Sequence, residues 1–159
     1  MRYFLILLLI ASLALSGYLA YQLYQLQQND HVVVHFIRAT PTNFLLVPVV
    51  RSVSAPASPE KALKQLLAGP TAAETELTPS VPSGTKLLGL TIENKTAIAD
   101  FSKEIQTNFV GGSQLESHLV QAIAAALTQF PEIDRVRILI EGKPVESIAG
   151  HVYIDYDLP

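Results

Sequence analysis

The longest helical pattern in this chain is the stretch SQLESHLVQAIAAALTQF, residues 113–130. Large apolar residues recur along it every three to four positions, at Leu115, Leu119, Ile123, Leu127 and Phe130. That spacing is typical of one face of an α-helix, and the alanines beside it let the helix lie close to a sheet. Ser113 and Glu116 have the spacing of a capping box, S-x-x-E, and Pro131 ends the helix. The sequence therefore predicts a long helix that packs on a sheet.

Strands are predicted on both sides of this helix. Residues 134–140 (DRVRILI) follow it, and residues 86–93 (KLLGLTIE) and 96–101 (TAIADF) precede it. The last two are separated only by Asn94 and Lys95, which is the length of a tight hairpin turn. We expect the inward faces to carry alternating apolar residues: Leu88, Leu90 and Ile92, then Ala97, Ala99 and Phe101, then Val136, Ile138 and Ile140.

The first half of the chain adds two strands and a helix. Residues 31–38 (HVVVHFIR) are apolar on both faces, which indicates an interior strand. Residues 44–53 (FLLVPVVRSV) form a second strand, and Pro48 places it at an edge or a bulge. Residues 58–69 (SPEKALKQLLAG) form a helix with Ser58 as its N-cap and a glycine at its end.

The predicted order is β-β-α-β-β-α-β, with no regular structure in the connector at residues 71–84 and a candidate short strand at residues 152–156. Strands that are not all separated by helices are typical of the α+β class. We expect an antiparallel or mixed sheet with two helices packed on one face. Residues 31–159 form one domain, which is large enough to fold without a disulfide.

The start of the chain is far more apolar than the rest. Residues 3–21 are interrupted only by two serines and one glycine. As a helix this run spans roughly 28 Å, close to the thickness of the hydrocarbon core of a bilayer. The sequence predicts a single N-terminal transmembrane helix, a signal anchor over residues 1–24, and a short linker over residues 25–30.

Charge predicts the orientation of this anchor. Arg2 precedes it, and the next basic residue is Arg38. The positive-inside rule then places the C-terminal domain outside the cytoplasm, as a single-pass protein of the cell membrane. Cleavage after the small-x-small triplet Ala14-Leu15-Ser16 would instead give a secreted or periplasmic protein. The chain has no cysteine, which excludes a lipid-anchoring cysteine, a disulfide and a thiol nucleophile.

Candidate catalytic residues are few. Asp100 and Ser102 flank a strand end, and His118 or His151 would complete a Ser–His–Asp set. The sequence has no G-x-S-x-G elbow, so we interpret Asp100 as a carboxylate that caps nearby backbone amides. We expect no catalytic site and no enzymatic activity.

Metal ligands are also few. His31 and His35 are four residues apart on a strand, about 13 Å, which is too far to share one metal. His151 with Asp155 or Asp157 would make a cation site, but a solvated or hydrogen-bonded tail is the favoured interpretation. We expect no metal and no cofactor.

Charged and glycine-rich segments have simple explanations. The acid pairs Glu74 with Glu76 and Asp155 with Asp157 are interpreted as solvated surface rather than a glycosidase pair.

Gly111-Gly112-Ser113 precedes a helix N-terminus, where anions bind readily, but a flexible start of the helix is favoured. Arg135, Arg137 and Lys143 form a small basic patch for a wall polymer or a partner, and a solvated edge that discourages strand addition is favoured.

Several short pieces, in this order and spacing, resemble the GerMN domain family of spore germination and sporulation proteins over most of residues 32–156. They are FIR at 36–38, LVPVVR at 46–51, LLAGP at 66–70, PSGTKL at 82–87, ADFS at 99–102, GS at 112–113, TQFP at 128–131, ILIEG at 138–142 and GH at 150–151. The resemblance implies an exported bacterial envelope domain, often membrane-tethered, with no known enzymatic chemistry. Similarity to ring-building modules of secretion assemblies suggests protein–protein assembly. Some members carry two copies of the domain, and this chain has one.

We therefore expect a membrane-anchored, extracytoplasmic and non-enzymatic binding or assembly module of the cell envelope. Expected partners are the membrane, through the N-terminal helix, and other envelope proteins or peptidoglycan, with self-association as an open alternative. The net charge of −3 gives no reason to expect nucleic acid. The alternative function is a cell-envelope hydrolase that acts on wall material through Asp100, His118 or His151.

Overall fold

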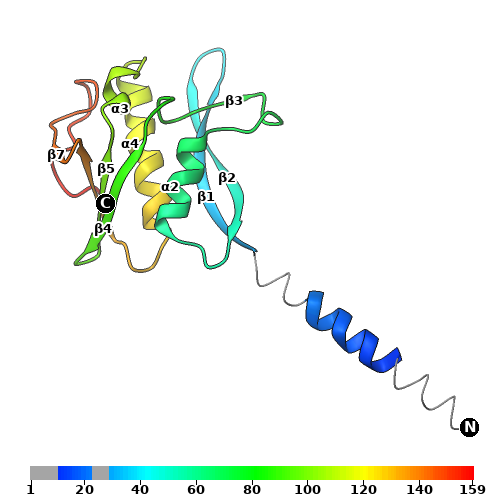
Figure 1. The fold of residues 1–159 in the computed structure, drawn as a ribbon. Helices are drawn as coiled ribbons and strands as arrows, with labels where there is room; N and C mark the ends of the chain where they lie inside the picture. Colours follow the sequence, from blue (N-terminus) through cyan, green and yellow to red (C-terminus); the bar gives the residue numbers. More distant parts are fainter. Residues whose placement is uncertain (1–10, 23–28) are drawn as a thin grey trace, which may run out of the picture.

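A computed structural model describes residues 11–22 and 29–159 (Figure 1). Residues 11–22 form a helix. The elements that follow are β1 (Asn29–Ala39), β2 (Phe44–Ser54), α2 (Pro59–Ala68), β3 (Leu77–Thr78), β4 (Leu87–Glu93), β5 (Thr96–Phe101), α3 (Glu104–Thr107), α4 (Ser113–Thr128), β6 (Arg135–Ile140) and β7 (Lys143–Pro144). Within the described residues the strands form two sheets, with the orders β2-β1-β3 and β4-β5-β6-β7.

The two long helices of the domain lie between these sheets (Figure 1). α2 contacts β1 and β4, α4 contacts β1, β2 and β6, and the two helices contact each other. The α+β class is as predicted, and the four-stranded sheet is mixed, because β5 and β6 are parallel. The expectation of one sheet is wrong. β1 and β2 pair along their full length, from Asn29 opposite Ser54 to Ala39 opposite Phe44, and form their own sheet on the other side of the helices.

β1 is the interior strand of the first sheet, as predicted, and β2 is an edge strand with Pro48 opposite His35. The connector is not wholly irregular, because it contains β3, which pairs with β1 at Ile37 and Arg38.

Side chains cover the rest of this edge of β1. Ser80 donates a hydrogen bond of 2.8 Å from Oγ to the carbonyl of His35. The amide of Gln129 accepts from the N–H of Val33 at 2.8 Å and donates to its carbonyl at 3.0 Å. Gln129 therefore makes the two bonds that a neighbouring strand would make.

The second sheet confirms the predicted hairpin. Asn94 and Lys95 both have positive φ, 50° and 64°, as a tight turn between β4 and β5 requires. The inward residues of β5 and β6 are at most 5% exposed, at Ala97, Ala99, Phe101, Val136, Ile138 and Ile140.

The predicted inward face of β4 is partly wrong. A register shift between Leu87 and Gly89 leaves Leu88 50% exposed, and Ile92 is 42% exposed, while Leu87 and Leu90 pack against the core.

The helices confirm one cap and correct another. Ser58 caps α2 by accepting from the N–H of Lys61 at 3.3 Å. The capping box on α4 is wrong, because Gly112 is the N-cap and the carboxylate of Glu116 is buried inside the domain. The short α3 was not predicted. The candidate strand at residues 152–156 is wrong, since the tail pairs only through a bridge between Leu158 and Val136.

The predicted anchor is described only in part. Every residue of the helix at 11–22 is exposed. Among the described residues, no helix combines the length and apolarity needed to cross a bilayer. Residues 1–10 and 23–24 of the predicted anchor, and residues 25–28 of the linker, lie outside the described residues. Asn29 and Asp30, which were expected in the linker, belong to β1.

Candidate functional site

Asp100 and Ser102, which the alternative hydrolase hypothesis would require, are both bonded to the backbone. Asp100 accepts the N–H of Gly142 at 2.8 Å, which confirms its interpretation as a capping carboxylate. Ser102 is 5% exposed and accepts the N–H of Lys86 at 2.9 Å. A hydrogen bond from the Ser102 hydroxyl also lowers the pKa of the Glu104 carboxyl. A buried hydroxyl with these partners is poorly placed to attack a substrate.

The two histidines have other partners. His118 Nε2 lies 3.1 Å from the carbonyl of Phe44 on β2, so this side chain joins α4 to the first sheet. The backbone N–H of His151 donates to Glu116 at 2.9 Å. Neither contact includes Asp100 or Ser102.

Asp155 and Asp157, the acids of the disfavoured cation site, both lie beside Arg137. Asp157 Oδ1 accepts from Nε of Arg137 at 2.8 Å and lies 2.7 Å from its Nη2, and Asp155 lies 3.7 Å from Nη1. Within the part of the chain that the structure describes, no group of three or more His, Cys, Asp or Glu residues is placed to hold a metal ion. The two acids instead neutralise Arg137. The predicted basic patch is thereby reduced to the exposed Arg135 and Lys143.

Glu74 is not a solvated surface residue. Both of its carboxylate oxygens accept from the guanidinium of Arg51, at 2.7 and 2.5 Å, and one also accepts the N–H of Thr71 at 2.7 Å. These bonds lower the pKa of Glu74 to about 2. Arg51 also lies over the ring of Phe36, 5.3 Å from its centroid. Glu76 is exposed as predicted, with Arg38 3.8 Å away. The Arg51–Glu74 pair therefore fastens the connector to the first sheet.

Glu116 is the important residue that sequence reasoning misassigned. It is fully buried and accepts three backbone N–H groups, from Ile148 at 2.9 Å, Ala149 at 2.8 Å and His151 at 2.9 Å. A signal was present in the sequence, because position 116 lies three residues before Leu119 on the buried face of the helix. A carboxylate on that face needs donors from another segment, and the C-terminal loop supplies them.

Gly111 has a packing role at the start of α4. A Cβ at this position would lie 2.7 Å from Cδ1 and 2.9 Å from Cβ of Leu115. Gly112 has no neighbour within 4 Å of such a Cβ. Close packing of the loop against the first turn of the helix, rather than flexibility or an anion site, therefore explains Gly111.

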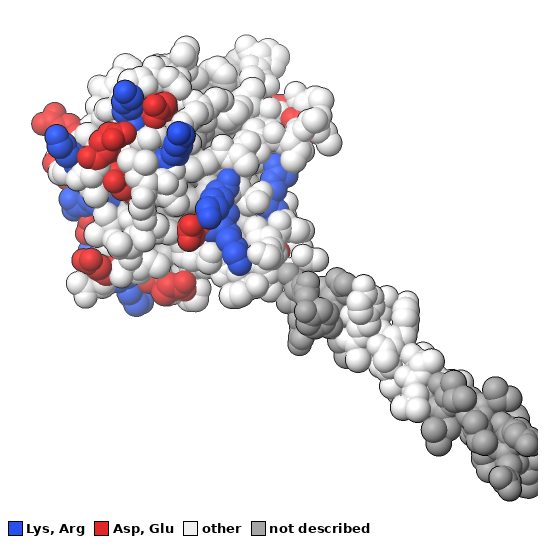
Figure 2. Space-filling view, in the orientation of Figure 1, with Lys and Arg blue, Asp and Glu red and all other residues white. Residues whose placement is uncertain are grey.

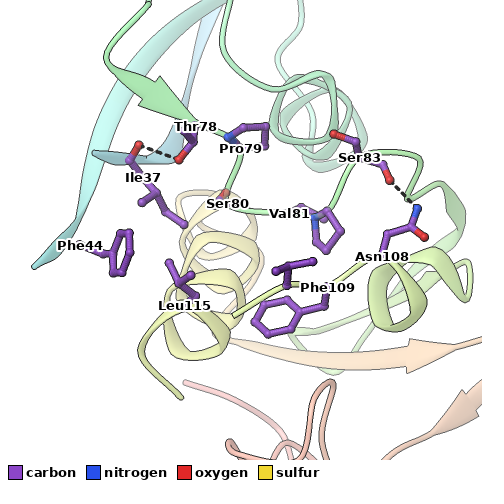
Figure 3. Close-up of a pocket in the computed structure, with 12 residues that line it drawn as sticks. Ile37, Phe44, Thr78, Pro79, Ser80, Val81, Ser83, Asn108, Phe109 and Leu115 are labelled. Atoms are coloured by element: carbon purple, nitrogen blue, oxygen red, sulfur yellow. Dashed lines mark hydrogen bonds between the residues drawn. The ribbon is translucent and has the colours of Figure 1, made fainter. Parts of the chain in front are cut away.

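A pocket of about 260 Å³, the tip pocket, lies beside this loop and is lined mainly by apolar side chains, with Thr78, Ser80, Ser83 and Asn108 among them (Figure 3). In Figure 3, Ile37, Phe44 and Leu115 lie on one side of it, and Val81 and Phe109 lie on the other. Polar groups at its margin are already bonded, since Ser80 donates to His35 and Asn108 donates to the carbonyl of Ser83 at 2.8 Å. An apolar cavity of about 150 Å³ already holds a benzene ring, so this pocket is large enough for an apolar side chain.

The residues that line the tip pocket are uncharged. Apart from Ile37, they fall within three segments, residues 39–47, 77–85 and 105–115, and these segments contain no Asp, Glu, Lys or Arg. We call their common surface the neutral tip. Figure 2 shows no charged residue over the turn between β1 and β2, at the upper end of the domain. Sequence reasoning missed this surface, because three distant segments build it and none has a motif of its own.

Comparisons with known proteins agree with the resemblance. A family model described as "Germane: Sporulation and spore germination" matches residues 22–146. No protein among the curated sequences matches this chain.

Solved structures that are similar to this chain include GerMN domains from Bacillus subtilis and one protein from Clostridium perfringens. The tandem GerMN domains of the sporulation protein GerM from Bacillus subtilis align with a TM-score of 0.66 and 18% identity, over 82% of this chain and 45% of theirs. This chain thus spans about half of that protein's length. The first GerMN domain of the same protein aligns with a TM-score of 0.61 and 25% identity, over 81% of this chain and 96% of that chain. A Clostridium perfringens protein named as a candidate lipoprotein aligns with a TM-score of 0.57 and 25% identity, over 81% of this chain and 86% of that chain.

Proposed function

This chain belongs to the Germane family of sporulation and spore germination proteins, and from that membership we propose that it is a membrane-anchored, extracytoplasmic binding module of the bacterial cell envelope. One GerMN domain, residues 31–159, carries the binding function and has no enzymatic activity. Its partners are other envelope proteins or peptidoglycan.

The tip pocket is the observation that carries this proposal. A concave site with apolar side chains and a few hydrogen-bonded polar groups is typical of a binding site, and no acidic or basic side chain lines it. The residues that a hydrolase would need are committed to structural bonds, Asp100 to Gly142 and Ser102 to Lys86. Binding therefore accounts for the described surface better than hydrolysis of wall material.

The exposed apolar helix supports a membrane anchor. Leu13, Leu15 and Leu19 are 64%, 59% and 52% exposed, and no part of the domain covers them. Exposed apolar area costs about 25 cal/mol per Å² in water, and a bilayer removes that cost. The positive-inside rule orients the domain outward.

Fractionation of bacteria that make the full chain tests the anchor. We expect the protein in the membrane fraction after alkaline carbonate washing, and external protease should degrade the domain once the outer layers are opened. A variant with Leu15→Arg and Leu19→Arg should leave the membrane, whereas Leu88→Arg and Ile92→Arg on β4 should not. Recovery of the unchanged protein as a soluble, shortened chain would favour cleavage and release instead.

A further inference from the structure

We propose that the neutral tip joins two copies of this chain, with Val110 of each copy inserted into the tip pocket of the other. The inference rests on the proposed function, because it names the partner of the same binding surface. It follows from three features of the tip: a projecting side chain beside a pocket, the absence of charge, and the polar margin.

Val110 is the projecting side chain. It is 89% exposed, the highest value among the large apolar residues of the described chain. Gly111 holds the loop close to Leu115, and this close contact presents Val110 outward at the margin of the tip pocket. Phe44 and Leu45, 38% and 45% exposed, project from the start of β2. One surface therefore carries both a projecting apolar side chain, Val110 (the knob), and a pocket large enough to accept one, the tip pocket (the hole).

A knob and a hole on one surface suit a two-fold interface. In such an interface the same surface of both copies meets, so residue i of one copy contacts residue j of the other and the reverse. Two Val110 side chains would then fill two pockets at once. The binding energy of a protein interface is usually concentrated in a few side chains that enter well-packed pockets near its centre.

The absence of charge favours a second copy over other partners. A two-fold contact brings like charges together, and each chain has a net charge of −3. The neutral tip avoids this repulsion. The same absence disfavours an anionic membrane or a nucleic acid, because neither finds a Lys or Arg there. Arg38 and Glu76, 3.8 Å apart, directly precede two of the uncharged segments and give the surface a polar margin.

The tether makes a weak contact sufficient. β1 has 11 residues, so the turn after it stands about 36 Å from Asn29, where the chain enters the domain. The turn thus lies at the end of the first sheet that is far from the point where the chain enters the domain. Two copies anchored in one membrane also have a raised effective concentration.

Single-cysteine crosslinking in membranes tests the proposal, since the natural chain has no cysteine. The full-length variants Val110→Cys and Leu45→Cys, treated with a short bis-maleimide, should give a product of twice the chain mass. Leu88→Cys, 50% exposed on β4, is the matched control and should remain monomeric. Adding Val110→Asp to Leu45→Cys should reduce the dimer by roughly tenfold or more, because a carboxylate cannot enter an apolar pocket unpaired. Adding Ile92→Asp, outside the tip, should leave the dimer unchanged.

The outcomes separate this inference from the proposed function. A membrane-bound chain whose tip cysteines crosslink no more than Leu88→Cys overturns the second-copy interface and leaves the binding module in place. A tip product of any other mass overturns it too, in favour of a different protein partner. A chain absent from the membrane fraction contradicts the proposed function, whatever the crosslinking shows.

Discussion

Two loops meet the first turns of α4, and the domain holds them in opposite ways. The C-terminal loop at residues 147–151 is fixed by the buried carboxylate of Glu116, which accepts three backbone N–H groups. The loop at residues 108–112 is held by the close contact of Gly111 with Leu115 and by an uncharged hydrogen bond from Asn108 to Ser83, and it leaves Val110 in solvent. A buried charged side chain, Glu116, thus fixes the first loop, whereas the second loop leaves an uncharged apolar side chain, Val110, in solvent. The second loop is therefore the one available to a partner.

Removing the carboxylate should have the largest effect. Glu116→Ala leaves three N–H groups without an acceptor, so the free energy of unfolding should fall by about 3–5 kcal/mol, measured by urea denaturation. Glu116→Gln keeps one acceptor oxygen, so its free energy of unfolding should fall by less than that of Glu116→Ala. Gln121→Ala, exposed on the same helix, is the control. A loss below about 1 kcal/mol for Glu116→Ala would mean that the loop needs no charge.

Crowding the second loop should have a smaller effect. Gly111→Ala places a Cβ 2.7 Å from Leu115 Cδ1, and the strain should cost about 1–3 kcal/mol of unfolding free energy. Gly112→Ala meets no atom within 4 Å, so it should cost only the loss of a glycine N-cap, no more than about 1 kcal/mol. Equal losses for the two alanine variants would contradict the close packing of this loop.

The connector is also held by charge, through the ion pair of Arg51 with Glu74. The pKa of Glu74 is lowered to about 2, so the folded state holds this carboxylate ionised more strongly than the unfolded state does. Its stabilisation is present above the ordinary pKa of 4.5 and is lost as the pH falls toward 2. Glu74→Gln should be less stable than the natural chain at neutral pH, and this difference should shrink as the pH falls through that window. A pH-independent difference between the two proteins would rule this linkage out.

Changing the projecting residue should have the smallest effect on stability. Val110 is 89% exposed, so Val110→Asp should alter the free energy of unfolding by no more than about 0.5 kcal/mol. Its effect is expected on association alone. A large loss in the urea experiment would show that the loop supports the fold and would weaken the contrast between the two loops.

Local signals in the sequence predicted most of the elements. Ser58 identified the start of α2, the pair Asn94 and Lys95 identified the hairpin, and the alternation in β5 and β6 identified their buried faces. These features depend on residues within a few positions of one another. For the same reason Asp100 could be interpreted correctly as a cap, since it lies at a strand end.

Features that depend on distant contacts were missed. The split into two sheets follows from the pairing of β1 with β3, about 40 residues later, and no local pattern encodes it. Glu116 has a perfect local explanation as part of a capping box, and its true donors lie 32 to 35 residues away. The tip pocket needs three segments at once. Local rules fail at these places because tertiary contacts outweigh them.

The hydrogen bonds between Gln129 and Val33 form late, because Gln129 is synthesised long after β1. The two residues are 96 positions apart, so the edge of β1 that Gln129 covers is unprotected until the chain has grown that far. At ordinary rates of synthesis, about 5–20 residues per second, this delay is roughly 5–20 s. During that interval the first hairpin offers an unpaired strand edge to any neighbouring chain. The first strands of such a chain must therefore be kept apart from other chains until its last helix has been made.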